Sequence, residues 1–167
     1  MNNNFRLIIT VIVIALFSGI VFAQKDTIKD YYLLMPQKYD GSTFAEREEI
    51  LSYESDTTID IENGYISYIT HLSGEVFEIT MFKRPDGGLM FAYNEDCDLE
   101  NNVLTKLYFL YYDGGRWIDV TSKVLPVPIN KRYKYKLPQK GTTIQVTTAG
   151  GKKMYNLIWK NGKFVKG

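Results

Sequence analysis

The sequence predicts an α+β fold, mainly an antiparallel β meander with two short N-terminal helices. Apolar residues follow a helical spacing before residue 52 and alternate with polar residues after residue 56. Turn signals then recur about every ten to twenty residues, so each strand should pair with the next one along the chain. The pattern leaves three architectures open for the sheet: an open curved sheet, a closed barrel and a two-layer sandwich.

The two helices are expected over residues 26–35 and 43–52. In the first, apolar side chains recur at helical spacing and Asp26 is the expected N-cap. The second begins with Thr43 and Glu46, which have the spacing of a capping box. The side chains of this helix that are expected to face the core are Phe44, Ile50 and Leu51.

Alternating apolar and polar residues predict a series of strands joined by short turns. Asn63-Gly64 favours a two-residue type I′ hairpin, because both turn positions need φ > 0, and Asn161-Gly162 marks another turn. Within residues 77–80, Glu78 and Thr80 are expected on the wetter face of the sheet. The expected strands are 58–62, 65–71, 75–83, 89–94, 104–112, 116–121, 131–136, 142–148, 152–159 and 163–165.

Residues 124–130 interrupt the strand pattern and are expected to form a crossover or an edge segment. Pro126 and Pro128 lie there, and proline donates no hydrogen bond to a sheet, so a central strand is excluded. The residues from Lys123 onward would make a marginal core on their own. This favours a single β-rich domain over residues 24–167, with two small domains as the alternative.

The first 23 residues have the three parts of a secretory signal peptide. Arg6 gives a positive start, residues 7–22 form an apolar stretch, and small residues precede a cleavage site after Ala23. We expect export to the periplasm or the extracellular space, with no membrane span after the signal is removed. The alternative is a retained membrane anchor, although this stretch is short for a hydrocarbon core that needs about 20 residues.

Charge is nearly balanced over the 167 residues, with 20 lysines and arginines and 19 aspartates and glutamates. This balance argues against a strongly basic nucleic-acid binder. It conceals two opposed blocks, because residues 24–122 carry 8 basic and all 19 acidic residues, whereas residues 123–167 carry 11 basic and no acidic residues. If both blocks share one sheet, their charges partly cancel across neighbouring strands. If they lie apart, the molecule has a basic pole suited to an anionic partner.

The most concrete candidate site is a basic stripe of Arg132, Lys134 and Lys136. On a strand these side chains project to one face, while Tyr133 and Tyr135 project to the other. Such a stripe can contact phosphate, sulfate or carboxylate groups, so the expected partner is an anionic envelope polymer or an acidic protein, and not nucleic acid. The alternative is an edge strand that its lysines protect from aggregation, with the tyrosines in the core.

Residues suited to catalysis or metal binding are sparse. His71 is the single histidine and Cys97 the single cysteine, so no zinc site, no intramolecular disulfide and no cofactor are expected. Cys97 is expected to be a small half-buried side chain, with a bridge between two chains as the alternative. Oxygen-bearing side chains alternate from Asn94 to Glu100 as in calcium loops, but the glycine and the terminal glutamate of such loops are missing. A solvated acidic loop is therefore favoured there.

These observations favour an exported, non-enzymatic β-rich binding or inhibitor-like module of unknown ligand, which predicts an exposed basic or aromatic patch. One alternative is a small exported hydrolase that uses a carboxylate pair or His71, which predicts a deep pocket around those groups. The other alternative is an envelope structural protein, which predicts self-association through sheet edges.

Overall fold

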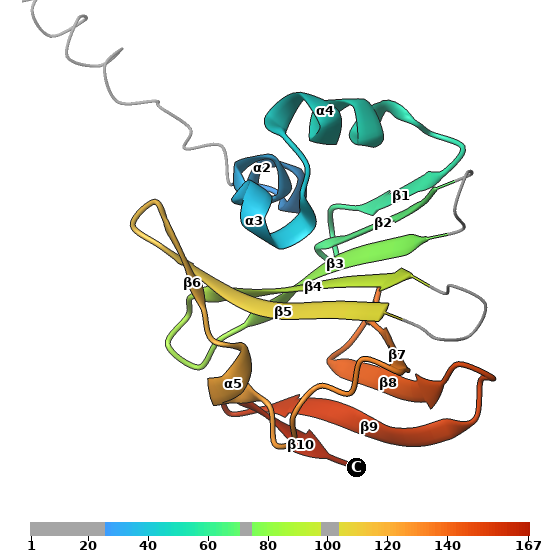
Figure 1. Cartoon of the computed structure of the whole chain (residues 1–167). Coiled ribbons are helices and arrows are strands. Elements are labelled where there is room, and N and C mark those ends of the chain that lie inside the picture. Colours follow the sequence, from blue (N-terminus) through green and yellow to red (C-terminus); the bar gives the residue numbers. More distant parts are fainter. Residues whose placement is uncertain (1–25, 71–74, 98–103) are drawn as a thin grey trace, which may run out of the picture.

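The computed structural model of the protein describes residues 26–70, 75–97 and 104–167 (Figure 1). Its helices are α2 (Ile28–Leu34), α3 (Gln37–Asp40), α4 (Phe44–Ser52) and α5 (Thr121–Val124). Its strands are β1 (Thr57–Asp60), β2 (Tyr65–Ile69), β3 (Val76–Lys83), β4 (Leu89–Cys97), β5 (Leu104–Asp113), β6 (Arg116–Asp119), β7 (Tyr133–Lys136), β8 (Thr143–Thr148), β9 (Lys153–Lys160) and β10 (Lys163–Lys166).

The strands form two antiparallel sheets, each an uninterrupted meander. One sheet has six strands in the order β1-β2-β3-β4-β5-β6, and the other has four in the order β10-β9-β8-β7. Helices α2 to α4 lie on one face of the six-stranded sheet, and the four-stranded sheet lies against its other face (Figure 1). The predicted α+β meander is confirmed, and of the three architectures left open the two sheets form an open sandwich rather than a barrel.

The six-stranded sheet is covered on both faces, and each face contributes to a separate apolar cluster. Toward the helices, the cluster includes Ile28, Tyr32, Met35, Tyr39, Ile66, Phe77, Ile79, Phe91, Tyr93 and Leu110. Toward the four-stranded sheet, it includes Tyr65, Phe82, Met90, Leu107, Phe109, Tyr135, Leu137, Ile144, Val146, Leu157, Trp159 and Phe164. The prediction of a wetter face at Glu78 and Thr80 is therefore wrong, since both are only 2% exposed beneath the second sheet.

The N-terminal helices differ in detail from the prediction. The N-cap of α2 is Thr27 instead of Asp26, because the Asp30 carboxylate accepts hydrogen bonds from the Thr27 backbone and hydroxyl, each at 2.7 Å. The short helix α3 was not predicted. In α4 the expected core residue Phe44 is 50% exposed, whereas Arg47 is buried against Asp40 of α3.

The turns show where a dipeptide signal suffices and where it does not. Asn161-Gly162 has positive φ at both residues and joins Lys160 to Lys163, as a type I′ turn requires. Asn63-Gly64 is not a two-residue hairpin, because Asp60 pairs with Tyr65 and four residues lie between them. The longer turn is favoured by the Asp60 carboxylate. This group accepts hydrogen bonds from the Asn63 backbone N–H at 3.0 Å and from the Asn63 side chain at 2.8 Å.

Two boundaries also move. Strand β4 continues through Asn94 to Cys97, so this part of the expected acidic loop is a paired strand opposite β5. Residues 125–132 contain no strand, as Pro126 and Pro128 predicted, and α5 precedes them.

Over the described ranges no helix is long and apolar enough to cross a membrane. The predicted signal peptide, His71, Asp98 and Glu100 lie outside the described residues.

Candidate functional site

The two charge blocks occupy different layers of the molecule. Helices α2 to α4 and the six-stranded sheet come from the acidic block, and the whole four-stranded sheet comes from the basic block. We call this four-stranded sheet, residues 133–166, the basic sheet, because its segment of chain carries no acidic residue. The sequence left two arrangements open, and the structure has the one in which the acidic and basic blocks lie apart, in different sheets.

The predicted stripe of Arg132, Lys134 and Lys136 lies at one edge of the basic sheet. Lys134 and Lys136 belong to the edge strand β7, and Arg132 lies exposed in the turn before it. Lys134 is half-buried, whereas Lys136 is mostly exposed and reaches the six-stranded sheet, where its Nζ lies 2.8 Å from Glu78 Oε1. Tyr135 is buried in the core, as the edge-strand alternative expected. The structure thus shows three basic residues in different environments rather than a uniform stripe.

A broader set of exposed basic residues lies on the strands and turns of the basic sheet, beyond the three residues of the predicted stripe. Phe164 of β10 is buried, so its neighbours Lys163 and Val165 point outward, with Lys160 paired to Lys163 and Ile158 paired to Val165. The exposed basic residues of this sheet and of its turns are Lys131, Arg132, Lys136, Lys140, Lys152, Lys153, Lys160, Lys163 and Lys166. The signal for this surface was the uninterrupted run of basic charge after residue 122.

Glu78 is the buried polar centre of the contact between the sheets. Its Oε1 accepts a hydrogen bond from the Tyr65 hydroxyl at 2.6 Å and the ion pair from Lys136, and its Oε2 accepts from the Leu137 backbone N–H at 2.8 Å. Burial, together with the hydrogen bond to Glu78, raises the pKa of Tyr65. These bonds give Glu78 a structural role in holding β7 against β3.

Asp96 lies on the same face of the six-stranded sheet, one strand away. Its carboxylate accepts a hydrogen bond from the Thr105 hydroxyl at 2.6 Å, and burial raises its pKa. Next to it, Asn94 is 1% exposed, and its Oδ1 has no hydrogen-bond partner among the described residues. Glu78 and Asp96 are thus two carboxylates between the sheets, and each accepts hydrogen bonds from groups of the protein itself.

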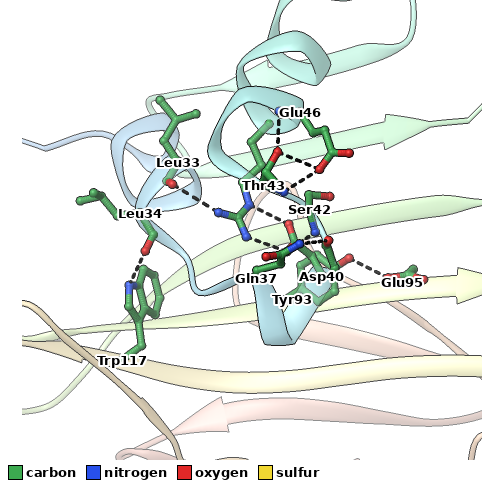
Figure 2. Close-up of polar contacts among 12 residues, drawn as sticks. Leu33, Leu34, Gln37, Asp40, Ser42, Thr43, Glu46, Tyr93, Glu95 and Trp117 are labelled. Atoms are coloured by element: carbon green, nitrogen blue, oxygen red, sulfur yellow. Dashed lines mark hydrogen bonds and ion pairs between the residues drawn. The ribbon is translucent and has the colours of Figure 1, made fainter.

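A second group of carboxylates lines a cleft of about 170 Å³ between the helices and the six-stranded sheet. Asp40 binds the Arg47 guanidinium there through two hydrogen bonds of 2.7 and 2.8 Å. Glu95 accepts a hydrogen bond from the Tyr93 hydroxyl at 2.8 Å, as Figure 2 shows, and an ion pair from Lys106 at 2.7 Å. Two of the carboxylates in this cleft are therefore already paired with basic side chains of the protein, Asp40 with Arg47 and Glu95 with Lys106.

The same region fixes the helices on the sheet. The Trp117 indole N–H of β6 donates to the Leu34 carbonyl at the end of α2, at 3.0 Å (Figure 2). Arg47 of α4 also donates to the Leu33 carbonyl, at 3.3 Å. The polar contacts around Asp40 thus stabilise the packing of three short helices. Sequence reasoning missed these contacts because the pattern did not indicate α3, the helix that carries Asp40.

A cavity of about 620 Å³ lies along the crossover between the two sheets, and a cavity of about 270 Å³ adjoins it at β5. The two share Asp119, Thr121 and Ile129 in their linings. The larger one is lined mainly by the crossover residues Leu125, Pro126, Val127, Pro128 and Ile129. The prolines predicted the crossover, but nothing in the sequence indicated the open cavity that the crossover lines.

The other candidate residues are placed as follows. Cys97 is a half-buried free thiol that donates a hydrogen bond to Glu75 Oε1 at 2.9 Å, and this bond raises the pKa of the thiol. Asn94 and Asp96 of the calcium candidate point into the contact between the sheets. Over the parts of the chain that the structure describes, no three His, Cys, Asp or Glu side chains are arranged to hold a metal ion.

Comparisons with known proteins identify the fold but not a family. No family model and no curated protein sequence matches the chain. Among solved structures, a domain of an uncharacterized protein from Porphyromonas gingivalis W83 superimposes with a TM-score of 0.61 at 12% sequence identity. The match covers 84% of this chain and 97% of that domain. This protein therefore shares its sandwich of helices and two antiparallel sheets with that bacterial domain.

Proposed function

We propose that the protein is an exported, non-enzymatic binding module that holds an anionic partner on its basic sheet. The observation that carries this proposal is the separation of charge by layer. The segment after position 122, with 11 basic and no acidic residues, supplies all four strands of the sheet that lies on the far side from helices α2 to α4. Export rests on the predicted signal peptide over residues 1–23. An anionic envelope polymer or an acidic protein fits this surface by charge.

The arrangement favours binding to an extended or repetitive anion. Lysines at Lys153, Lys160 and Lys163 are exposed on neighbouring strands, so several can contact one chain of charges at once. Between them the outer face offers polar side chains such as Gln145 and Asn156, which pair across β8 and β9 and can donate hydrogen bonds. Because the opposite layers are acidic, the molecule has a dipole that orients this face toward an anionic surface.

Surface ion pairs are individually weak, worth about 0–1 kcal/mol each. Affinity must therefore come from several lysines acting together, and it should fall steeply as salt rises. This is the behaviour expected of a module that tethers or recognises a charged polymer, and it requires no catalytic group.

The test measures binding of the chain from Gln24 onward to immobilised dextran sulfate and to polyglutamate at low salt. The test variant is K153Q/K160Q/K163Q, and its matched control is K29Q/K38Q/K83Q, which removes the same charge from the acidic layers. We expect the test variant to bind at least about tenfold more weakly and the control to change less than about twofold. Equal losses in both variants would show that net charge alone determines binding, and the absence of any binding to either polymer would reject the proposal.

The two alternatives make separate predictions. A hydrolase would depend on His71 or on a carboxylate pair, and the described carboxylates Asp40 and Glu95 are bound to Arg47 and Lys106. An envelope structural protein would self-associate, so size-exclusion chromatography of the mature chain would show concentration-dependent oligomers. The proposed module is expected to remain one size over the same range.

A further inference from the structure

Strand β5 has a gap in its backbone pairing on the edge that faces β6. Strand β6 pairs with β5 over Leu110–Asp113 and then leaves it. Next to that, the Val120 N–H donates to the Phe109 carbonyl at 2.8 Å, and the Phe109 N–H donates to the Thr121 hydroxyl at 2.9 Å. At the other end of the gap, the Thr105 N–H donates to the Lys131 carbonyl at 3.3 Å.

Leu107 lies in the middle of this gap. In an antiparallel sheet the backbone groups of successive residues point alternately to the two neighbouring strands. Thr105 and Phe109 direct theirs away from β4, so the N–H and C=O of Leu107 point the same way. Among the described residues, no hydrogen bond reaches these two groups on that side.

A cavity lies where the missing strand would be. The space of about 270 Å³ is lined by Leu107 and its neighbours on one side and by Thr121 and Ile129 on the other. It adjoins the crossover cavity of about 620 Å³. Pro126 and Pro128 fix the φ angle at two positions of the crossover wall, so this wall is largely preformed.

We propose that the β5 edge and the crossover cavity together form a binding site for an extended peptide segment. Its backbone would pair with the N–H and C=O of Leu107, which need a donor and an acceptor at strand spacing. An apolar side chain of the segment would enter the cavity beside Leu125 and Val127.

The charges at the two ends of the site define the segment further. Lys131 lines the end near Thr105, where the ammonium of Lys106 is already paired with Glu95, and Asp119 lines the end near Phe109. The complementary ligand is therefore a strand-forming peptide with a central apolar residue, an acidic residue on one side and a basic residue on the other. This site lies on β5 and the crossover, so it does not depend on the proposed function of the basic sheet.

The test begins with selection of displayed random linear heptapeptides against the chain from Gln24 onward. The enriched peptides are then synthesised and titrated into wild type and V127D, which places a charge in the cavity at a half-buried position outside the core cluster. The matched control is V165D, on the exposed outer face of the basic sheet. We expect V127D to weaken binding at least tenfold and V165D to leave it within twofold.

A second measurement reports on the pairing itself. Amide hydrogen exchange at Leu107 is expected to slow at least tenfold when the peptide is bound, and K153Q/K160Q/K163Q is expected to bind the peptide as wild type does. The inference is overturned if no heptapeptide is enriched, if V127D binds as tightly as V165D, or if exchange at Leu107 does not change.

Discussion

Lys136 of β7 and Glu78 of β3 form an ion pair of 2.8 Å between the two sheets, the one side chain 67% exposed and the other 2%. The pair joins the basic layer to the acidic layer at the edge of the sandwich. Glu78 also accepts from Tyr65 and from the Leu137 backbone, so its charge is stabilised from three directions. This contact holds the edge strand of the basic sheet against the rest of the molecule.

We expect loss of Glu78 to be far more costly than loss of its exposed partner. Glu78→Ala removes the acceptor of two buried hydrogen bonds and of the ion pair with Lys136, and should lower the free energy of unfolding by about 3–5 kcal/mol. Lys136→Met should lower it by about 1–2 kcal/mol, because water still reaches one side of the pair. Lys163→Met, at the exposed start of β10, should stay within about 0.5 kcal/mol. Urea unfolding measures all three, and equal values for Lys136→Met and Lys163→Met would contradict the role of the pair.

The Arg47–Asp40 pair predicts a different outcome, because both side chains are only 3% exposed. Arg47→Met leaves the Asp40 carboxylate buried without its cation and should destabilise by about 3–5 kcal/mol. The double variant R47M/D40L removes both charges and should recover at least half of that loss. Lys106→Met, at an ion pair with an exposed lysine, is the control and should cost no more than about 1 kcal/mol. Thermal and urea unfolding measure the stability of each variant, and a double variant as unstable as R47M would contradict this account.

These two pairs show what the sequence could and could not predict. The order of strands was predictable because turn signals such as Asn161-Gly162 act over a few residues. Burial of Arg47 in place of Phe44 was not, because it depends on Asp40, which belongs to a helix that the pattern did not indicate. Glu78 was assigned to a wetter face for a similar reason, since its cover comes from a sheet that begins more than fifty residues later.

The candidate site, too, could be predicted only in part from the sequence. The basic block and its segregation after residue 122 are properties of composition, so they were visible in the sequence. The individual roles of Arg132, Lys134 and Lys136 depend on what lies across the sheet edge, which no local pattern contains. The cavity at the crossover depends on the path of a loop relative to β5, and only the positions of Pro126 and Pro128 hinted at that path.

Asp96 should make stability depend on pH in a defined direction. Burial raises its pKa above the usual 3.8, and the hydrogen bonds from Thr105 and Asn94 offset only part of this effect. The folded protein then holds the proton more tightly than the unfolded chain does, so this contribution to stability is lost as pH rises from 3.8 through the raised pKa. Asp96→Asn cannot titrate, so its stability relative to wild type should improve across that window and stay constant above it.

Urea unfolding of wild type and D96N at a series of pH values measures this difference. Thr105→Val removes a donor to the charged form of Asp96, so the pKa of Asp96 should rise further and the total loss of stability with rising pH should be larger. A stability difference between D96N and wild type that is flat, or that falls as pH rises, would show that the carboxylate is not desolvated between the sheets.

The reactivity of Cys97 tests the cleft side of the six-stranded sheet. Its hydrogen bond to Glu75 raises the pKa of the thiol above the usual 9.0, with a smaller contribution from the charge of Glu95, while Lys106 acts in the opposite direction. Because the thiolate is the reactive form, alkylation by iodoacetamide should be slow at mildly alkaline pH. Glu75→Gln should speed it by about threefold or more, and Glu95→Gln by less. Lys106→Met should slow it further, and acceleration in that variant would contradict the arrangement of charges around the thiol.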